Sequence, residues 1–80
     1  MTNEINKNSK EYQLAYEIAE VLEDLESMDV YLTITSRLNE SVCRKLLHRV
    51  MTIPEDKIKR TRGALFTYLA KQNGGFGYRH

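Results

Sequence analysis

A chain of 80 residues with 41% hydrophobic and 29% charged side chains is too apolar to remain disordered and too short to build two separate cores. Its single cysteine, Cys43, excludes an intramolecular disulfide framework, and no segment has the run of apolar residues that a membrane span requires. The N-terminus lacks the apolar stretch of a secretory signal, so we expect a cytoplasmic protein that makes no contact with a membrane.

The net charge of +1 conceals an uneven division of charge along the chain. Residues 1–40 carry three Lys or Arg against nine Asp or Glu, whereas residues 41–80 carry nine against two. This division indicates one of two arrangements: a surface that faces a polyanion, or two halves that pack together and neutralise each other.

The first predicted element is an amphipathic helix over residues 9–26. Residues 1–8 before it are polar and unpatterned, and we expect them to form a flexible arm. Asn8 and Glu11 have the spacing of a capping box at the start of the helix, with Asn in place of the usual Ser or Thr. Acidic residues occupy the face opposite an apolar stripe at helical spacing. This stripe consists of Leu14, Ile18, Val21, Leu22 and Leu25.

Residues 28–38 fit two patterns. The β-branched residues of VYLTIT (30–35) alternate as in a strand, but Ile34 and Leu38 also fit helical spacing. No other stretch offers a partner strand, and an isolated strand leaves its backbone N–H and C=O groups unpaired. We therefore expect a helix here.

A third helix is predicted over residues 40–51, with Asn39 as its cap and with cations on its outer face. Pro54 cannot continue this helix, but it suits the first turn of a short new one in which acidic residues precede cations. The side chains expected to face inward from residues 40–51 are Val42, Cys43, Leu46, Leu47 and Val50.

The last predicted helix covers residues 62–72. Thr61 is its expected N-cap, and Asn73-Gly74-Gly75 supplies residues that tolerate the left-handed conformation at a helix end. Residues 74–80 are expected to form a flexible tail. The apolar stripe of this helix consists of Ala64, Leu65, Tyr68 and Leu69.

Together these elements predict an all-α fold, a small bundle of four or five short helices in a single domain over residues 9–73. The predicted core consists of Leu14, Ile18, Leu22, Leu25, Ile34, Leu38, Val42, Leu46, Val50, Leu65 and Leu69.

No set of side chains has the spacing of a catalytic or metal site. The glycines at 74–77 follow a helix, whereas a phosphate-binding loop joins a strand to a helix. Cys43 and His48 do not share a helix face, so we interpret Cys43 as a buried hydrophobe and His48 as a surface histidine. The carboxylates of the first helix are interpreted as a solvated face. We expect a protein that is not an enzyme and that needs neither a cofactor nor a metal ion.

The strongest functional signal is a basic cluster just before the last helix. Four cations lie within residues 57–62, beside a helix N-terminus whose N–H groups and dipole favour anions. Neutralising phosphates requires Lys and Arg on one surface, so the cluster predicts contact with nucleic acid, although connectors often carry such residues without a function. Aromatic residues in the tail offer stacking on unpaired bases. The predicted contact residues are Lys57, Lys59, Arg60, Arg62, Arg44, Lys45 and Arg49, and the tail residues are Phe76, Tyr78 and Arg79.

Protein binding is the alternative function. Phe66 lies off the stripe of the last helix, so it is either an exposed interface residue or part of a second core face in a helix that is packed on two sides. This alternative predicts a protein partner or a homodimer that uses Phe66 and Tyr68. The basic cluster would then be neutralised by the acidic first helix.

Residues 62–71, RGALFTYLAK, resemble the closing helix of DnaD-type and plasmid replication-initiator helical regions, in which a Pro- or Gly-containing turn leads into a helix of the form A-x-x-x-Y-L. The resemblance implies a helical accessory module that acts in DNA replication or on a mobile element. It carries over one residue, Tyr68. The winged-helix part of those proteins has no counterpart in this chain, and the acidic first helix does not match them.

Overall fold

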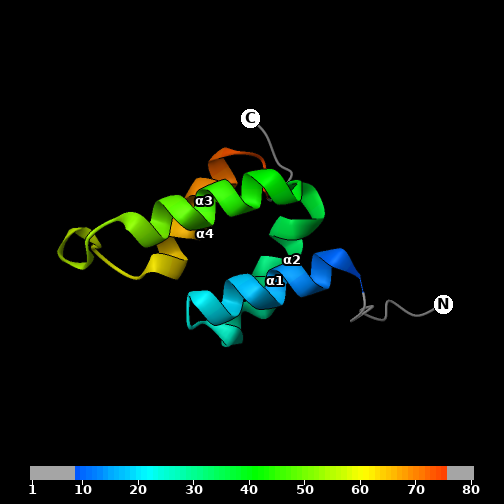
Figure 1. The fold of residues 1–80 in the computed structure, drawn as a ribbon, viewed down its shortest axis with the longest axis horizontal. Coiled ribbons are helices and arrows are strands. Elements are labelled where there is room, and N and C mark those ends of the chain that lie inside the picture. The colour runs from blue at the N-terminus through cyan, green and yellow to red at the C-terminus, as the bar shows by residue number, and fades with distance from the viewer. Residues whose placement is uncertain (1–8, 76–80) are drawn as a thin grey trace.

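The computed structural model describes residues 9–75, which form four α-helices and two 3₁₀ turns and contain no strand (Figure 1). The predicted all-α fold is confirmed, and residues 30–35 lie in a helix. The predicted arm (1–8) and residues 76–80 of the predicted tail lie outside the described part of the chain. The elements are α1 (Lys10–Val21), a 3₁₀ turn (Leu25–Ser27), α2 (Met28–Arg37), α3 (Glu40–Thr52), a 3₁₀ turn (Glu55–Lys57) and α4 (Arg62–Gln72).

Three of the four described helices begin at a side chain that accepts a hydrogen bond from a backbone N–H of the first turn. Such a cap satisfies one of the N–H groups that a helix start leaves unpaired. The predicted caps Asn39 and Thr61 are confirmed, whereas α1 is capped by Ser9 and not by the predicted Asn8. The hydrogen bonds run from Tyr12 N to Ser9 Oγ (3.0 Å), from Val42 N to Asn39 Oδ1 (2.9 Å) and from Ala64 N to Thr61 Oγ1 (3.0 Å).

α1 and α4 end in the same backbone closure, in which a residue with positive φ turns the chain back onto the last helical turn. In α4 this residue is Gly74 (φ 88°), as the sequence predicts, but in α1 it is Glu23 (φ 55°). α1 ends at Val21, so the predicted extension of the first helix to residue 26 is wrong. The sequence did not indicate this stop, because glutamate rarely adopts positive φ. The closing hydrogen bonds run from Asp24 N to Ala19 O (2.8 Å) and from Gly75 N to Ala70 O (2.7 Å).

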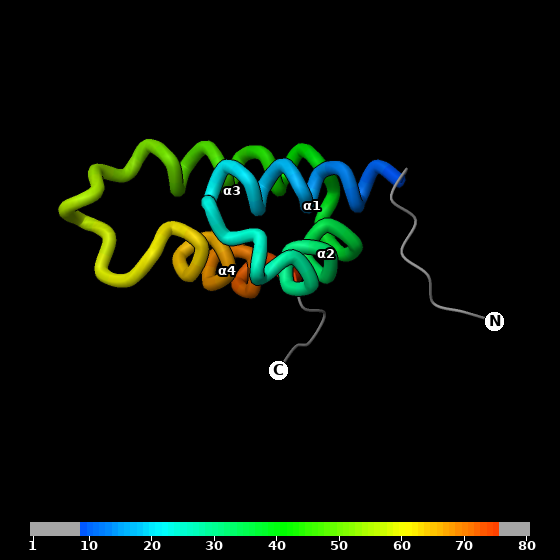
Figure 2. The backbone as a smooth tube through the Cα atoms, turned by 90° about the horizontal axis from the view of Figure 1, so that it is seen from below, coloured from blue at the N-terminus to red at the C-terminus, as the bar shows by residue number. Residues whose placement is uncertain are grey.

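The four helices form two layers. α1 and α3 lie in one layer, and α2 and α4 lie in the other, as Figure 2 shows. α1 packs on α2 and α3 packs on α4, while α2 also contacts both α3 and α4 and so joins the two pairs. The connector between α3 and α4, residues 53–61, projects from one end of the bundle.

The core includes most of the predicted apolar residues, but not all of them. Leu25 is 49% exposed, because it follows the stop at Glu23, and Val21 is also exposed. Leu38, Val42, Leu65 and Leu69 are only partly buried at the edge of the core. The buried hydrophobic residues are Leu14, Ala15, Ile18, Ala19, Leu22, Tyr31, Ile34, Cys43, Leu46, Leu47, Val50, Phe66 and Ala70.

A buried tyrosine fixes α4 against α2. Tyr31 is fully buried, its hydroxyl donates a hydrogen bond to Asp24 Oδ2 (2.9 Å), and its ring packs edge-on against Phe66 with the centroids 5.9 Å apart. Burial raises the pKa of Tyr31, and the hydrogen bond to the Asp24 carboxylate raises it further. A Cβ at Gly63 would lie 2.7 Å from the Tyr31 hydroxyl, so glycine allows the close approach of the two helices.

Candidate nucleic-acid interface

The projecting connector carries much of the predicted basic cluster. Pro54 precedes its 3₁₀ turn, and Thr61 ends it as the cap of α4, so both ends of the connector are held by local structure. Lys57, Lys59 and Arg60 lie between these points and are exposed. The projection of the connector leaves these cations accessible to a large partner.

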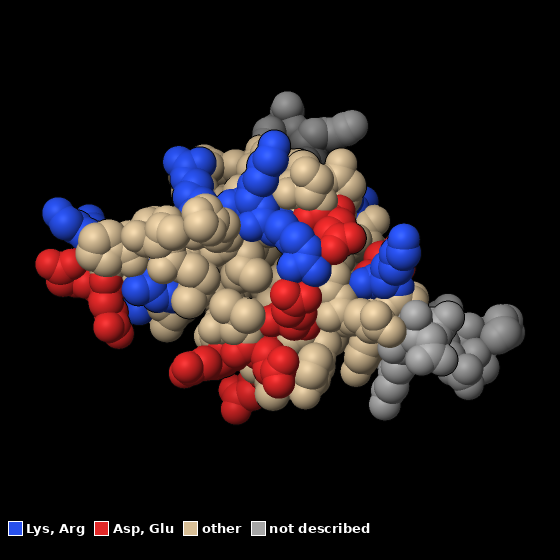
Figure 3. Space-filling view, viewed as in Figure 1, with Lys and Arg blue, Asp and Glu red and all other residues tan. Residues whose placement is uncertain are grey.

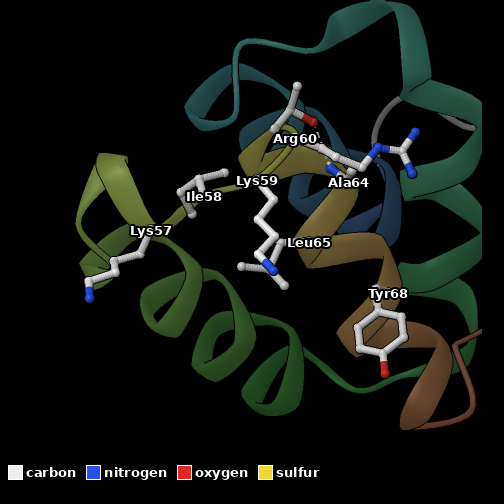
Figure 4. Close-up of a pocket in the computed structure, with 8 residues that line it drawn as sticks. Lys57, Ile58, Lys59, Arg60, Ala64, Leu65 and Tyr68 are labelled. Atoms are coloured by element: carbon white, nitrogen blue, oxygen red, sulfur yellow. Dashed lines mark hydrogen bonds between the residues drawn. The ribbon is translucent and has the colours of Figure 1, made fainter.

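A groove with a volume of about 380 Å³ runs between the connector and α4. Ile58, Ala64 and Leu65 are partly buried and provide an apolar floor. In Figure 4 the side chain of Lys57 points away from the groove, whereas that of Lys59 extends across it toward Leu65. The groove is lined by Lys57, Ile58, Lys59, Arg60, Thr61, Ala64, Leu65 and Tyr68.

Arg62, a predicted phosphate ligand, makes its hydrogen bonds within the protein. Its Nη1 donates hydrogen bonds to the carbonyl oxygens of Val50 (2.6 Å) and Ile53 (2.7 Å), at the end of α3. These acceptors belong to the last turn and C-cap of α3, where carbonyls have no partner within the helix. Arg62 therefore ties the start of α4 to the end of α3, and we exclude it from the contact surface.

Arg44, another predicted ligand, is paired with carboxylates. Its Nη1 and Nη2 donate to the two carboxylate oxygens of Glu17 (3.0 and 3.1 Å), and its Nε donates to Glu40 Oε2 (2.7 Å). The hydrogen bond from Arg44 lowers the pKa of Glu17, and the same bond raises the pKa of Arg44. The acidic first helix therefore does neutralise part of the basic half, at Arg44.

The remaining predicted ligands are exposed, and no ion pair or hydrogen bond joins their side chains to another residue within 9–75. Two of them lie four residues apart on the outer face of α3, and three lie on the connector. Figure 3 shows cations over α3 and at the connector end, where carboxylates of the connector also lie, and further carboxylates along the lower edge by α1. These five cations are Lys45, Arg49, Lys57, Lys59 and Arg60.

The two predicted interface aromatics have opposite environments. Phe66 is fully buried, so it belongs to a second core face and cannot contact a partner, whereas Tyr68 is 55% exposed. The reason is that α4 packs against both α2 and α3 and buries the face that includes Gly63, Phe66 and Ala70. Leu65, predicted as core, instead lines the groove. The small residues Gly63 and Ala70 lie on the same face as Phe66. This pattern was the signal in the sequence that this face packs closely against other helices.

Other sites are not supported within the described residues. No group of three His, Cys, Asp or Glu side chains between residues 9 and 75 is arranged to hold a metal ion. None of the four helices combines the length and the apolar character needed to cross a membrane. Cys43 is buried, and burial raises the pKa of its thiol, so little of the reactive thiolate forms. Phe76, Tyr78 and Arg79 lie outside the described part of the chain.

The sequence matches no protein-family model, and neither curated proteins nor solved structures give a match. The resemblance of residues 62–71 to DnaD-type helical regions therefore stays a prediction.

Proposed function

We propose that the protein is a small non-enzymatic helical module that contacts nucleic acid through the outer face of α3 and the projecting connector. The observation that carries the proposal is the division of the predicted cations into two groups. Arg44 and Arg62 are bound within the fold, whereas the other five are exposed without a partner among residues 9–75. The resemblance of residues 62–71 supports a role in DNA replication or on a mobile element.

The physical basis of the contact is the release of counterions from the polyanion. Each phosphate that a Lys or Arg neutralises frees condensed cations, so affinity falls as salt is added. If three to five of the exposed cations take part, log K should fall with log salt with a slope of roughly −2 to −4.5. Glu55 and Asp56 on the connector oppose the contact, so we expect micromolar rather than tighter affinity.

The test is a titration of labelled duplex DNA, single-stranded DNA and RNA with the purified protein at about 50 mM and about 200 mM salt. Binding should weaken steeply at the higher concentration. Lys59→Glu/Arg60→Glu should abolish it, and circular dichroism should show unchanged helical content because both residues are exposed.

The matched control is Lys10→Glu/Arg37→Glu, which changes the net charge by the same amount at exposed positions at the start of α1 and the end of α2, away from the connector. This control should retain most of the affinity. Equal loss in both double variants would show that only net charge matters, and the proposed surface would be rejected. No binding at low salt would reject the function itself.

A protein partner or a homodimer is the second candidate, and the groove with its exposed Tyr68 favours it. The predicted site at Phe66 is replaced by this groove, since Phe66 is buried. This candidate predicts an association that is insensitive to salt. Sedimentation of the protein over a range of concentrations, with Tyr68→Ala as the variant, distinguishes it from the first.

A further inference from the structure

Tyr68 is the most exposed large hydrophobic residue in the described part of the chain. Its hydroxyl accepts a hydrogen bond from Gln72 Nε2 (3.0 Å), one turn further along α4. This bond limits the rotation of the side chain and holds the ring at the surface. A ring held at the surface loses less conformational entropy when a ligand stacks on it.

Tyr68 also separates two hollows in the surface. The first is the groove of about 380 Å³ with Lys59 and Leu65. The second, of about 430 Å³, lies on the side of α2, where Asp24, Val30 and Thr67 are among the residues that line it. Arg60 and Tyr68 line both hollows. The tyrosine thus has space on both sides and cations nearby.

We infer that these hollows bind an unpaired stretch of a polynucleotide, with a base stacked on Tyr68 and the adjoining phosphates held by Lys59 and Arg60. The inference rests on the proposed nucleic-acid contact and adds the form of nucleic acid that the site takes. Aromatic rings interleaved with cations are what single-strand binding requires, because every base has a π-face and every nucleotide a phosphate.

The shape of the site favours an unpaired strand over a duplex. A duplex presents phosphates on its outside and stacks its bases inside, so an apolar floor of Ile58, Ala64 and Leu65 would contact nothing that it complements. An unpaired strand exposes base faces that can cover this floor. The chemistry is shared by DNA and RNA, and the experiment separates the two.

The experiment uses the full chain and oligonucleotides of about 15 nucleotides that carry one 2-aminopurine, a base whose fluorescence is quenched by stacking. The probes are a single-stranded DNA, an RNA of the same sequence and the corresponding DNA duplex. Binding to the parent protein should quench the fluorescence of the single strands, and the affinity for one or both of them should exceed that for the duplex by about 10-fold or more.

Three variants assign the quenching to Tyr68. Tyr68→Ala should lose about 10-fold or more in affinity for the single strand together with the quenching. Tyr68→Phe retains the stacking ring and loses only the hydrogen bond that limits its rotation, so it should keep the quenching and bind within a few-fold of the parent, about 3-fold at most. Tyr16→Ala removes another exposed tyrosine, on α1, and should change nothing. Both positions are at the surface, so the three variants should fold.

The outcomes separate this inference from the proposed function. Suppose that duplex and single strand bind equally and that Tyr68→Ala binds like the parent, while Lys59→Glu/Arg60→Glu does not bind. The proposed nucleic-acid contact is then supported, and the stacking site at Tyr68 is rejected. If no oligonucleotide binds at low salt, both are rejected. If poly-glutamate displaces the single strand as effectively as unlabelled oligonucleotide, the site accepts an acidic protein segment, and the inference is overturned.

Discussion

The two faces of α4 differ in a way that the amino-acid composition of the helix does not suggest. The inward face carries Gly63, Phe66 and Ala70, which is two small residues and one large one, while the outward face carries Leu65 and Tyr68. The side chain at position 63 must be small, because the Tyr31 hydroxyl occupies the space between α2 and α4 at this point. The outward face leaves Tyr68 exposed beside the partly buried Leu65 of the groove, and an exposed aromatic at a groove is typical of a binding site.

The largest expected effect is on the inward face. Phe66→Ala removes a fully buried ring that packs on Tyr31, and it should lower the free energy of unfolding by about 3–5 kcal/mol, which approaches the total stability of so small a domain. Thermal and urea unfolding monitored by circular dichroism measure this. Tyr68→Ala, two residues away, should change stability by less than about 1 kcal/mol. A folded, stable Phe66→Ala protein would contradict the assignment of the inward face.

Arg60 and Arg62 lie two residues apart, yet Arg60 is exposed and Arg62 donates hydrogen bonds to the end of α3. Arg62→Ala leaves the carbonyls of Val50 and Ile53 without their charged donor, and we expect a loss of about 1.5–3 kcal/mol in unfolding free energy. Arg60→Ala should leave the unfolding free energy nearly unchanged but weaken oligonucleotide binding and reduce its salt dependence. Equal stability of the two variants would show that the Arg62 hydrogen bonds contribute little.

Gly63→Ala tests the close approach of α4 to Tyr31. The new methyl group would meet the Tyr31 hydroxyl and the Asp24 carboxylate, and we expect a net loss of about 1–2 kcal/mol, despite the higher helix propensity of alanine. In a Tyr31→Phe background the hydroxyl is absent, so the same substitution should cost less. An unchanged cost in that background would show that the hydroxyl is not the obstacle.

The smallest effect concerns Arg44, the cation that α1 neutralises. Because the hydrogen bond from Arg44 lowers the pKa of Glu17 from its usual value, this pair stabilises the fold at neutral pH and ceases to do so as pH falls through the pKa of Glu17 in the folded state. Glu17→Gln should lower the melting temperature by at most a few degrees at pH 7, since the pair is largely exposed. The difference from the parent should vanish at low pH. A difference that persists there would have another cause.

Several features were predictable because they depend on neighbours in the chain. The caps at Asn39 and Thr61 and the stop at Gly74 follow from residue types that satisfy helix ends or tolerate positive φ. The stop at Glu23 could not be predicted in this way, since the backbone there adopts a conformation that glutamate does not favour.

The candidate site was predicted less well, because the same residue type can serve the fold or a ligand. Lys59, Arg60 and Arg62 look alike in sequence, yet Arg62 alone reaches two carbonyls of α3. Likewise, Phe66 and Tyr68 were both predicted to lie in an interface, although only Tyr68 is exposed. Which of the two is buried depends on which side of α4 meets α2, and residues far from α4 in the sequence decide this.

The helical class and the bounds of α4 follow from the amino-acid sequence alone, because hydrophobic periodicity, caps and glycine stops act over a few residues. Two features depend on how the helices pack: which face of α4 is buried, and which cations are bound by Glu17, Glu40 and the end of α3. The physical reason is that burial and ion pairing depend on distances between segments that lie far apart in the chain.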